Sequence, residues 1–221
     1  MNSLKLFLQF FSESYQKFVK NFSTYLGSYI AFVAIGFLAS IPWQGMGYED
    51  NSFYEIVFSI VVGVLSLIVI VNVILIEKAS HKHIEKEELM YAAPTYLIYT
   101  LYSSLIMLLG FVCFIVPGII LAVLVGMVPL ASVLIDNDSV NYFKVSYRMA
   151  RKDAVLIICF GVASVLIELP SFAFDLIPDW RIKLFCDLGY ALLDGVILSV
   201  VTITSVRIFY HLKAALNDPS Q

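Results

Sequence analysis

The fold is decided by residues 97–135, which read LIYTLYSSLIMLLGFVCFIVPGIILAVLVGMVPLASVLI, an apolar run of about forty residues without a charged side chain. A single helix of that length would measure about 60 Å, roughly twice the thickness of a hydrocarbon core of about 30 Å. Pro117-Gly118 interrupts the run, and proline removes a helical hydrogen bond while glycine permits a sharp turn. We therefore predict two membrane-spanning helices joined by a tight hairpin, with Pro117 and Gly118 as its structural turn on the outer side.

The rest of the chain has the same apolar character. It is 60% hydrophobic and only 14% charged, whereas soluble domains carry about 25% charged residues. A water-soluble fold of 221 residues could not bury that much apolar surface. The sequence predicts an all-α polytopic membrane protein, a single integral domain over residues 1–221, with about six spans at residues 22–41, 53–76, 94–116, 119–135, 154–177 and 184–210.

The distribution of Lys and Arg predicts the orientation. With six spans, twelve of the 14 basic residues fall on the side that holds both termini, and only Arg181 and Lys183 fall on the other. Cytoplasmic loops carry the excess of Lys and Arg. We expect a bacterial inner-membrane protein with both termini cytoplasmic and with residues 43–52 and 178–183 as outer loops. No cleavable signal peptide is expected, because the first residues lack an apolar segment followed by a cleavage site.

Two amphipathic segments lie outside these spans, at residues 4–20 and 139–152. Both are expected to be interfacial helices on the cytoplasmic surface. Asp138 or Ser139 is predicted to cap the second helix. Its apolar positions and its basic positions fall on neighbouring faces, the former being Val140, Phe143, Tyr147 and Ala150, and the latter Lys144, Arg148 and Arg151.

The basic segment predicts a lipid headgroup site formed by Lys144, Arg148, Arg151 and Lys152. Arg148 is the first candidate for a phosphate contact, because a guanidinium can bind two oxygens at once. The alternative is an internal ion pair of Arg148 with Asp136 or Asp153. Anionic membrane phospholipids are thus the expected partners, together with a protein partner in the membrane, and no nucleic acid is expected.

Four intramembrane acidic residues form two pairs, each spaced by seven: Glu168 with Asp175, and Asp187 with Asp194. Seven residues make about two helical turns, so each pair shares one face. A proton, cation or amine pathway is one interpretation, because buried acids in membranes usually face a partner, water or a substrate. The other is that the carboxyl groups lie near the outer interface, where Arg181 and Lys183 neutralise Asp175 and Asp187.

No catalytic or metal-binding constellation is recognisable. Cys113, Cys159 and Cys186 lie in or beside apolar runs and are not spaced as metal ligands. His81 and His83 belong to a charged connector, EKASHKHIEKEEL, without a complete zinc set. The GxSG, HExxH, Walker and Rossmann motifs are absent from the sequence. We expect no cofactor, no metal and no enzymatic activity.

One stretch is similar to a known family. It comprises Val116-Pro117-Gly118-Ile119-Ile120-Leu121-Ala122, then Pro129, then Ser146-Tyr147-Arg148 with the following basic residues. This pattern resembles the YciC-like family of bacterial inner-membrane proteins and the related membrane domain attached to some glycerophosphodiester phosphodiesterases. The match covers about residues 116–153, and Phe18-Val19-Lys20-Asn21-Phe22 fits it too. The resemblance implies an inner-membrane protein without an assigned activity, and it implies no lipid hydrolysis because the phosphodiesterase domain is absent here.

Two functions follow as hypotheses. The first is a non-catalytic membrane component or partner subunit in envelope or lipid homeostasis. The second is a small transporter or channel that uses Glu168 and Asp194, which would need a polar route through the bilayer. An intramembrane enzyme is a third, weaker hypothesis.

Overall fold

The computed structural model describes residues 2–39, 52–81, 86–113, 115–136, 140–174 and 180–216. All regular structure in these residues is helical, which confirms the predicted all-α class. The helices are α1 (Ser3–Lys20), α2 (Phe22–Ala39), α3 (Ser52–Ala79), α4 (Lys86–Cys113), α5 (Ile115–Val125), α6 (Val128–Leu134), α7 (Tyr142–Lys152), α8 (Ala154–Phe174) and α9 (Trp180–Leu216).

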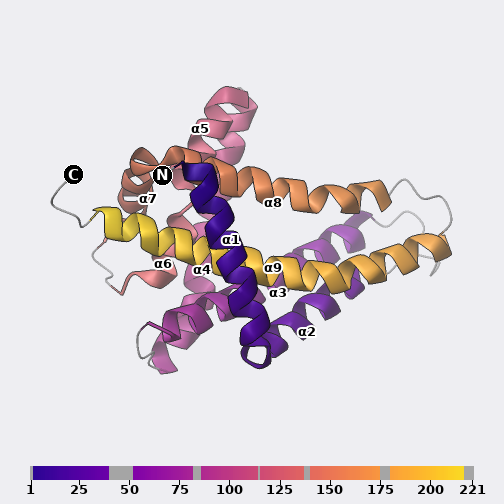
Figure 1. Cartoon of the computed structure of the whole chain (residues 1–221). Helices are drawn as coiled ribbons and strands as arrows, with labels where there is room; N and C mark the ends of the chain where they lie inside the picture. Colours follow the sequence, from indigo (N-terminus) through magenta and orange to yellow (C-terminus); the bar gives the residue numbers. More distant parts are fainter. Residues whose placement is uncertain are drawn as a thin grey trace.

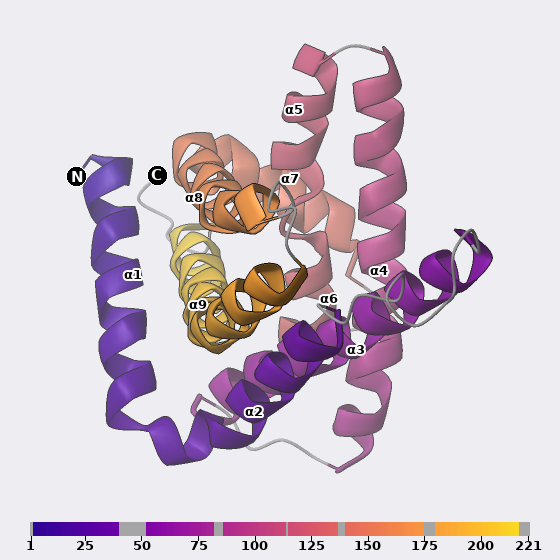
Figure 2. The ribbon, with the colours of Figure 1, turned by 90° about the vertical axis from the view of Figure 1, so that its right-hand side faces the viewer.

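The helices are arranged around α9, the longest of them. Figure 2 shows α8 and α9 nearly end-on, between α1 on one side and the hairpin of α4 and α5 on the other. In Figure 1, α1 crosses over α9, while α2 and α3 lie beneath α9 and pack against it. The short helix α7 packs against α5, α6, α8 and α9. The C-terminal helix α9 is therefore surrounded by helices from the N-terminal part of the chain, α1 to α3, and by α7 and α8.

Four helical stretches in the described part are long and apolar enough to cross a membrane, namely Ile56–Ala79, Tyr91–Val112, Ile115–Leu134 and Phe185–Leu216. A fifth is obtained if α1 and α2, which are bent by 99° relative to each other, are counted as one broken span. The described apolar part of α8, Ala154–Leu166, is shorter than a span. The membrane-spanning character of the chain is thus supported for four to five helices, and the number six stays a prediction.

Several helices extend beyond the predicted spans. The helix that was expected to begin after Pro94 begins at Lys86 and contains Pro94, and proline is tolerated inside apolar helices when neighbouring groups satisfy the freed carbonyl. Residues 180–183 of the expected outer loop belong to the first turn of α9, because nothing between Trp180 and Lys183 stops a helix. The remaining residues of both predicted outer loops lie outside the described part, except Ser52, which begins α3.

The predicted span 119–135 is also divided in two. A turn at Gly126 and Met127 separates α5 from α6, and Pro129 occupies the first turn of α6. Proline suits a first helical turn because its missing N–H would have no intrahelical partner there. The shortened helices place Ile135 and Asp136 directly after α6.

The hairpin of α4 and α5 is a close antiparallel pair (Figure 2). Its turn comes before the predicted position, because Pro117 and Gly118 lie in the first turn of α5 and are helical. Gly118 is instead a packing residue. A Cβ on Gly110 would come within 2.9 Å of the Gly118 Cα, and a Cβ on Gly118 within 2.4 Å of the Phe111 ring.

Small residues also bring α2 and α9 together. A Cβ on Gly36 would meet the Ala191 Cβ at 3.1 Å, and one on Gly195 would meet Val33 and Tyr29. Buried hydroxyl groups of α9 are satisfied within their own helix, for example Ser199 on the Gly195 carbonyl at 2.8 Å and Thr204 on the Val200 carbonyl at 2.7 Å. This arrangement lets a helix with polar side chains occupy the centre of an apolar bundle.

Candidate functional site

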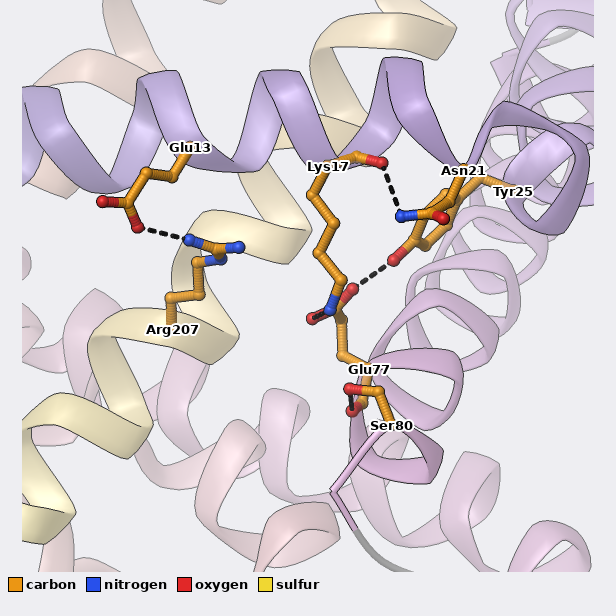
Figure 3. A network of polar contacts seen from close by, with 7 residues as sticks. All are labelled: Glu13, Lys17, Asn21, Tyr25, Glu77, Ser80 and Arg207. Atoms are coloured by element: carbon orange, nitrogen blue, oxygen red, sulfur yellow. Dashed lines mark hydrogen bonds and ion pairs between the residues drawn. The ribbon is translucent and has the colours of Figure 1, made fainter.

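A cluster of charged groups joins α1, α2, α3 and α9, and we call it the ionic corner; it comprises Glu13, Lys17, Tyr25, Glu77 and Arg207 (Figure 3). Its centre is the Glu77 side chain, which is only 1% exposed. The Lys17 Nζ lies 2.7 Å from the Glu77 Oε2, and the Tyr25 hydroxyl donates to the Glu77 Oε1. Both oxygens of this buried carboxylate are therefore bonded, which offsets the cost of its burial.

The second ion pair of the ionic corner is more exposed. The Arg207 Nη1 lies 2.6 Å from the Glu13 Oε2, with side-chain exposures of 27% and 43%. At the other end of α1, the Ser3 hydroxyl is 3.1 Å from the Asp153 carboxylate, which also accepts from the Leu156 backbone N–H at 2.9 Å. Polar contacts thus fasten α1 across the bundle along most of its length.

Sequence reasoning missed the ionic corner. It counted Lys17 and Arg207 as topology signals and Glu77 as part of a solvated connector. The available signal was the position of Arg207 inside the apolar helix α9 and of Glu77 at the end of the apolar helix α3, where a charge needs a partner. The neighbouring Lys78 is also buried; it pairs with Asp136 and donates to the Val133 carbonyl at 2.6 Å, which joins α3 to the end of α6.

A cavity of about 320 Å³ opens beside the ionic corner, and we call it the basic cavity. It is lined by Phe10, Lys17, Glu77, His81, Arg207, Tyr210 and His211. The His81 ring lies 4.9 Å from the Tyr210 ring, and the Phe10 ring meets His211 edge-on at 5.4 Å, measured between centroids. No group of His, Cys, Asp and Glu in the described part of the chain could hold a metal ion; His83 lies outside that part.

The predicted headgroup residues lie on α7, and most of them face outward. Lys144, Arg148 and Arg151 are exposed, and Lys152 is half-buried. The Arg151 guanidinium lies 5.9 Å from the centre of the Tyr147 ring. The two acids suggested as internal partners of Arg148 have other contacts, since Asp136 pairs with Lys78 and Asp153 binds Ser3 and the Leu156 N–H.

The N-cap and the buried face of α7 differ from the prediction. Asn141 is the N-cap, and its side chain accepts from the Lys144 N–H at 3.0 Å; Asp138 and Ser139 lie outside the described residues. The buried face consists of Tyr142, Ser146, Met149 and Ala150, while Tyr147 is exposed. The predicted apolar face was therefore rotated, because the serine at its centre is buried for its hydrogen bonds rather than for its hydrophobicity.

Ser146 connects α7 to the break between α5 and α6. Its hydroxyl donates to the Leu124 carbonyl at 2.7 Å and accepts from the Met127 N–H at 3.2 Å. These are backbone groups that the interrupted helix leaves without intrahelical partners. The serine of the Ser146-Tyr147-Arg148 pattern thus has a structural explanation that sequence reasoning did not give it.

An apolar cavity of about 550 Å³ lies between α4, α5, α6 and α8. Its walls include Met107, Ala122, Met127, Ile157 and Val165. Its one hydroxyl, on Ser164, donates to the Phe160 carbonyl of its own helix at 3.0 Å. None of the described residues of α7 lines this cavity; α7 is connected to its wall through Ser146, whose hydroxyl accepts from the N–H of the lining residue Met127.

The predicted intramembrane acids are placed only in part. Asp187 and Asp194 are half-buried on α9, and each takes part in a further interaction. Glu168 belongs to α8, which continues through Pro170 to Phe174. The side chain of Glu168 and the whole of Asp175 lie outside the described part.

In comparisons with known proteins, no family model matches the chain, and no curated protein or solved structure is significantly similar to it. The resemblance of residues 116–153 to the YciC-like family therefore stays a prediction.

Proposed function

We propose that the chain is a non-catalytic integral protein of the bacterial inner membrane that binds an anionic phospholipid, as a component or partner subunit in envelope or lipid homeostasis. The observation that carries the proposal is the apolar cavity, whose lining residue Met127 is hydrogen-bonded to Ser146 of the basic helix α7. An acyl chain would occupy the cavity and the headgroup phosphate would be bound by Lys144, Arg148 and Arg151.

The cavity has the properties of an acyl-chain site. Ligand pockets measure about 300–1,000 Å³ and are mostly apolar, and this cavity has about 550 Å³ and a lining of aliphatic, aromatic and methionine side chains. It is open rather than sealed, as a site filled laterally from a bilayer must be. The adjoining helix offers charges of the right sign, each worth about 1 kcal/mol near an anionic membrane surface.

The arrangement of α7 favours a headgroup contact over an internal role for Arg148. The helix is fixed by its buried face through Ser146, so its basic face is presented outward. Arg151 is held over the Tyr147 ring, whereas Arg148 is exposed and its two suggested partner acids bind other groups. An exposed guanidinium near phosphates forms two parallel hydrogen bonds with one phosphate group.

The competing function is a transporter or channel that uses Glu168 and Asp194. The observation in its favour is the half-buried position of Asp194 on the central helix α9. The transporter or channel function predicts that the wild type carries protons or cations into proteoliposomes and that Asp194→Asn abolishes this flux. The lipid-binding function predicts no such flux in the wild type.

A lipid-dependent thermal shift tests the proposal. The triple variant Lys144→Gln, Arg148→Gln, Arg151→Gln is compared with a matched control, Lys5→Gln, Lys20→Gln, Lys213→Gln, which removes the same charge elsewhere. Phosphatidylglycerol should raise the melting temperature of the wild type and the control more than phosphatidylcholine does, and this difference should disappear in the α7 variant. If phosphatidylglycerol stabilises Arg148→Ala as much as the wild type, Arg148 is not the headgroup contact; an equal effect on all variants would refute the site.

The orientation is tested separately by cysteine labelling from outside. A probe at Asn51 should react and a probe at Lys82 should not. The reverse pattern would overturn the charge-based topology and place α7 on the outer surface.

A further inference from the structure

We propose that the basic cavity between α1, α3 and α9 is a second binding site, for a phosphate group that carries a small apolar or aromatic substituent. It shares no lining residue with the apolar cavity beside α7. The proposal is therefore independent of the lipid site proposed above.

The first argument is the excess of hydrogen-bond donors. The lining contains an ammonium group, a guanidinium group, two imidazoles and a phenol, against one carboxylate, that of Glu77. Both oxygens of this carboxylate are already bonded, to Lys17 and to Tyr25. The lining therefore offers more N–H and O–H donors than anionic acceptors, which favours an anion over a cation.

The second argument is that Lys17 and Arg207 have N–H donors that are not used in their ion pairs. Among the described residues, Lys17 uses one of its three N–H donors on Glu77, and Arg207 uses one of its five on Glu13. His81 and His211 are held by aromatic rings rather than by acids. Donors from α1, from α9 and from the turn after α3 suit a tetrahedral anion with many lone pairs, and a guanidinium binds such an anion through two parallel bonds.

The third argument concerns the remainder of the ligand. The rings of Phe10 and Tyr210 form part of the wall, and a cavity of about 320 Å³ exceeds the volume of an inorganic phosphate. An apolar or aromatic substituent would pack against these rings. Such a phosphate group could belong to a free small molecule or to the headgroup of a phospholipid.

The test uses phenyl phosphate, titrated calorimetrically into the full chain in phosphatidylcholine nanodiscs. In a second arm, the α7 triple variant, which lacks the charges of the lipid site proposed above, is placed in nanodiscs that contain phosphatidic acid. Binding of phenyl phosphate identifies a free organic phosphate as the ligand class, and stabilisation by phosphatidic acid alone identifies a lipid headgroup. Absence of both effects refutes the site.

Variants separate a ligand site from a purely structural cluster. His81→Gln with His211→Gln leaves both ion pairs intact, and we expect about tenfold weaker binding from the loss of the two imidazole donors. Arg207→Lys keeps the positive charge but removes the planar guanidinium with its paired N–H donors, and we expect binding to weaken by a similar factor. The control Lys213→Gln, on the same helix but outside the cavity, should bind as the wild type does.

Glu13→Gln gives the sharpest result. It removes the carboxylate that competes for the Arg207 guanidinium without changing the cavity lining. We expect about threefold tighter binding, whereas a purely structural cluster predicts no gain. If Glu13→Gln, Arg207→Lys and the double histidine variant all bind like the wild type, the proposal is wrong.

Discussion

The ionic corner and the hairpin of α4 and α5 hold helices together in opposite ways. In the ionic corner, a carboxylate that is 1% exposed is bonded by partners from two other helices. At the end of the hairpin, Leu109, Val112 and Ile115 are 66%, 75% and 71% exposed, and the two helices meet through glycine. Electrostatic pairing fixes the first region, whereas close backbone packing fixes the second and leaves its apolar side chains free to contact lipid.

The stability of the two regions therefore depends on different surroundings: the ionic corner depends on its protein partners, and the hairpin on the lipid around it. A buried ion pair depends on its partners, and removal of one partner leaves an uncompensated charge. An apolar hairpin gains little from water exclusion once lipid surrounds it, so the helices associate through van der Waals contact at small residues. Mutations in the two regions should therefore differ in size and in their dependence on lipid.

The largest effect is expected from Glu77→Ala. It leaves Lys17 and Tyr25 without their buried acceptor, and removal of one partner of a buried pair costs about 3–5 kcal/mol. The free energy of unfolding would be measured by titration with sodium dodecyl sulfate in mixed micelles. A loss below about 1 kcal/mol, the value of an exposed pair, would show that the ionic corner does not hold α1 to the bundle.

Gly110→Ala tests the hairpin. The new Cβ would lie within 2.9 Å of the Gly118 Cα, so the helices must separate, and overpacking of this kind costs about 1–3 kcal/mol. Gly63→Ala is the matched control, because nothing lies within 4 Å of its Cβ; alanine should be neutral or stabilising there by up to about 1 kcal/mol. Equal stabilities of the two variants would contradict the close approach of α4 and α5.

Ser146→Ala tests the attachment of α7 to the break between α5 and α6, which depends on a polar group rather than on close backbone packing. Loss of its bonds to Leu124 and Met127 should cost about 1–3 kcal/mol, because the bond to Met127 is buried and the bond to Leu124 is partly buried. Ser164→Ala is the control, as its hydroxyl bonds only to its own helix. A Ser146→Ala variant as stable as this control would mean that the break does not depend on α7.

The smallest effect is expected from Glu13→Gln. The pair with Arg207 is partly exposed, with side-chain exposures of 43% and 27%, and such pairs are worth about 0–1 kcal/mol. The measurement is the same detergent titration, repeated at low and high salt. A cost comparable to that of Glu77→Ala would show that the two pairs act as one unit.

The apolar pattern predicted the helices because period and length are local properties of the sequence. Every predicted span corresponds to a helix or to the pair α5 and α6, and the amphipathic segments correspond to α1 and α7. The helix starts at Lys86 and Trp180 were not predicted, because the helices continue beyond the apolar stretch into polar residues. The break at Gly126 was missed, because the hydroxyl that bonds its backbone groups belongs to Ser146, which is 19 residues after Met127.

The candidate sites also differ in whether their residues lie close together in the sequence. The basic residues of α7 were recognisable because Lys144, Arg148 and Arg151 lie close together in the sequence. The ionic corner was not, because Glu77 is separated by 60 residues from Lys17, and Arg207 by 194 residues from Glu13. Such pairs follow from the way α1 crosses α9, which no local pattern specifies.

Photocrosslinking tests the central claim most directly, namely that an anionic phospholipid occupies the apolar cavity beside α7. Phosphatidylglycerol with a photoreactive group on one acyl chain would be incorporated with the wild type, the α7 triple variant and the matched charge control, and the labelled peptides would be identified. We predict labelling concentrated on the cavity segments 119–130 and 157–166 of the wild type and the control, and its loss from these segments in the α7 variant. Labelling spread equally over the apolar helices, including α3, and unchanged by the α7 substitutions would contradict the claim.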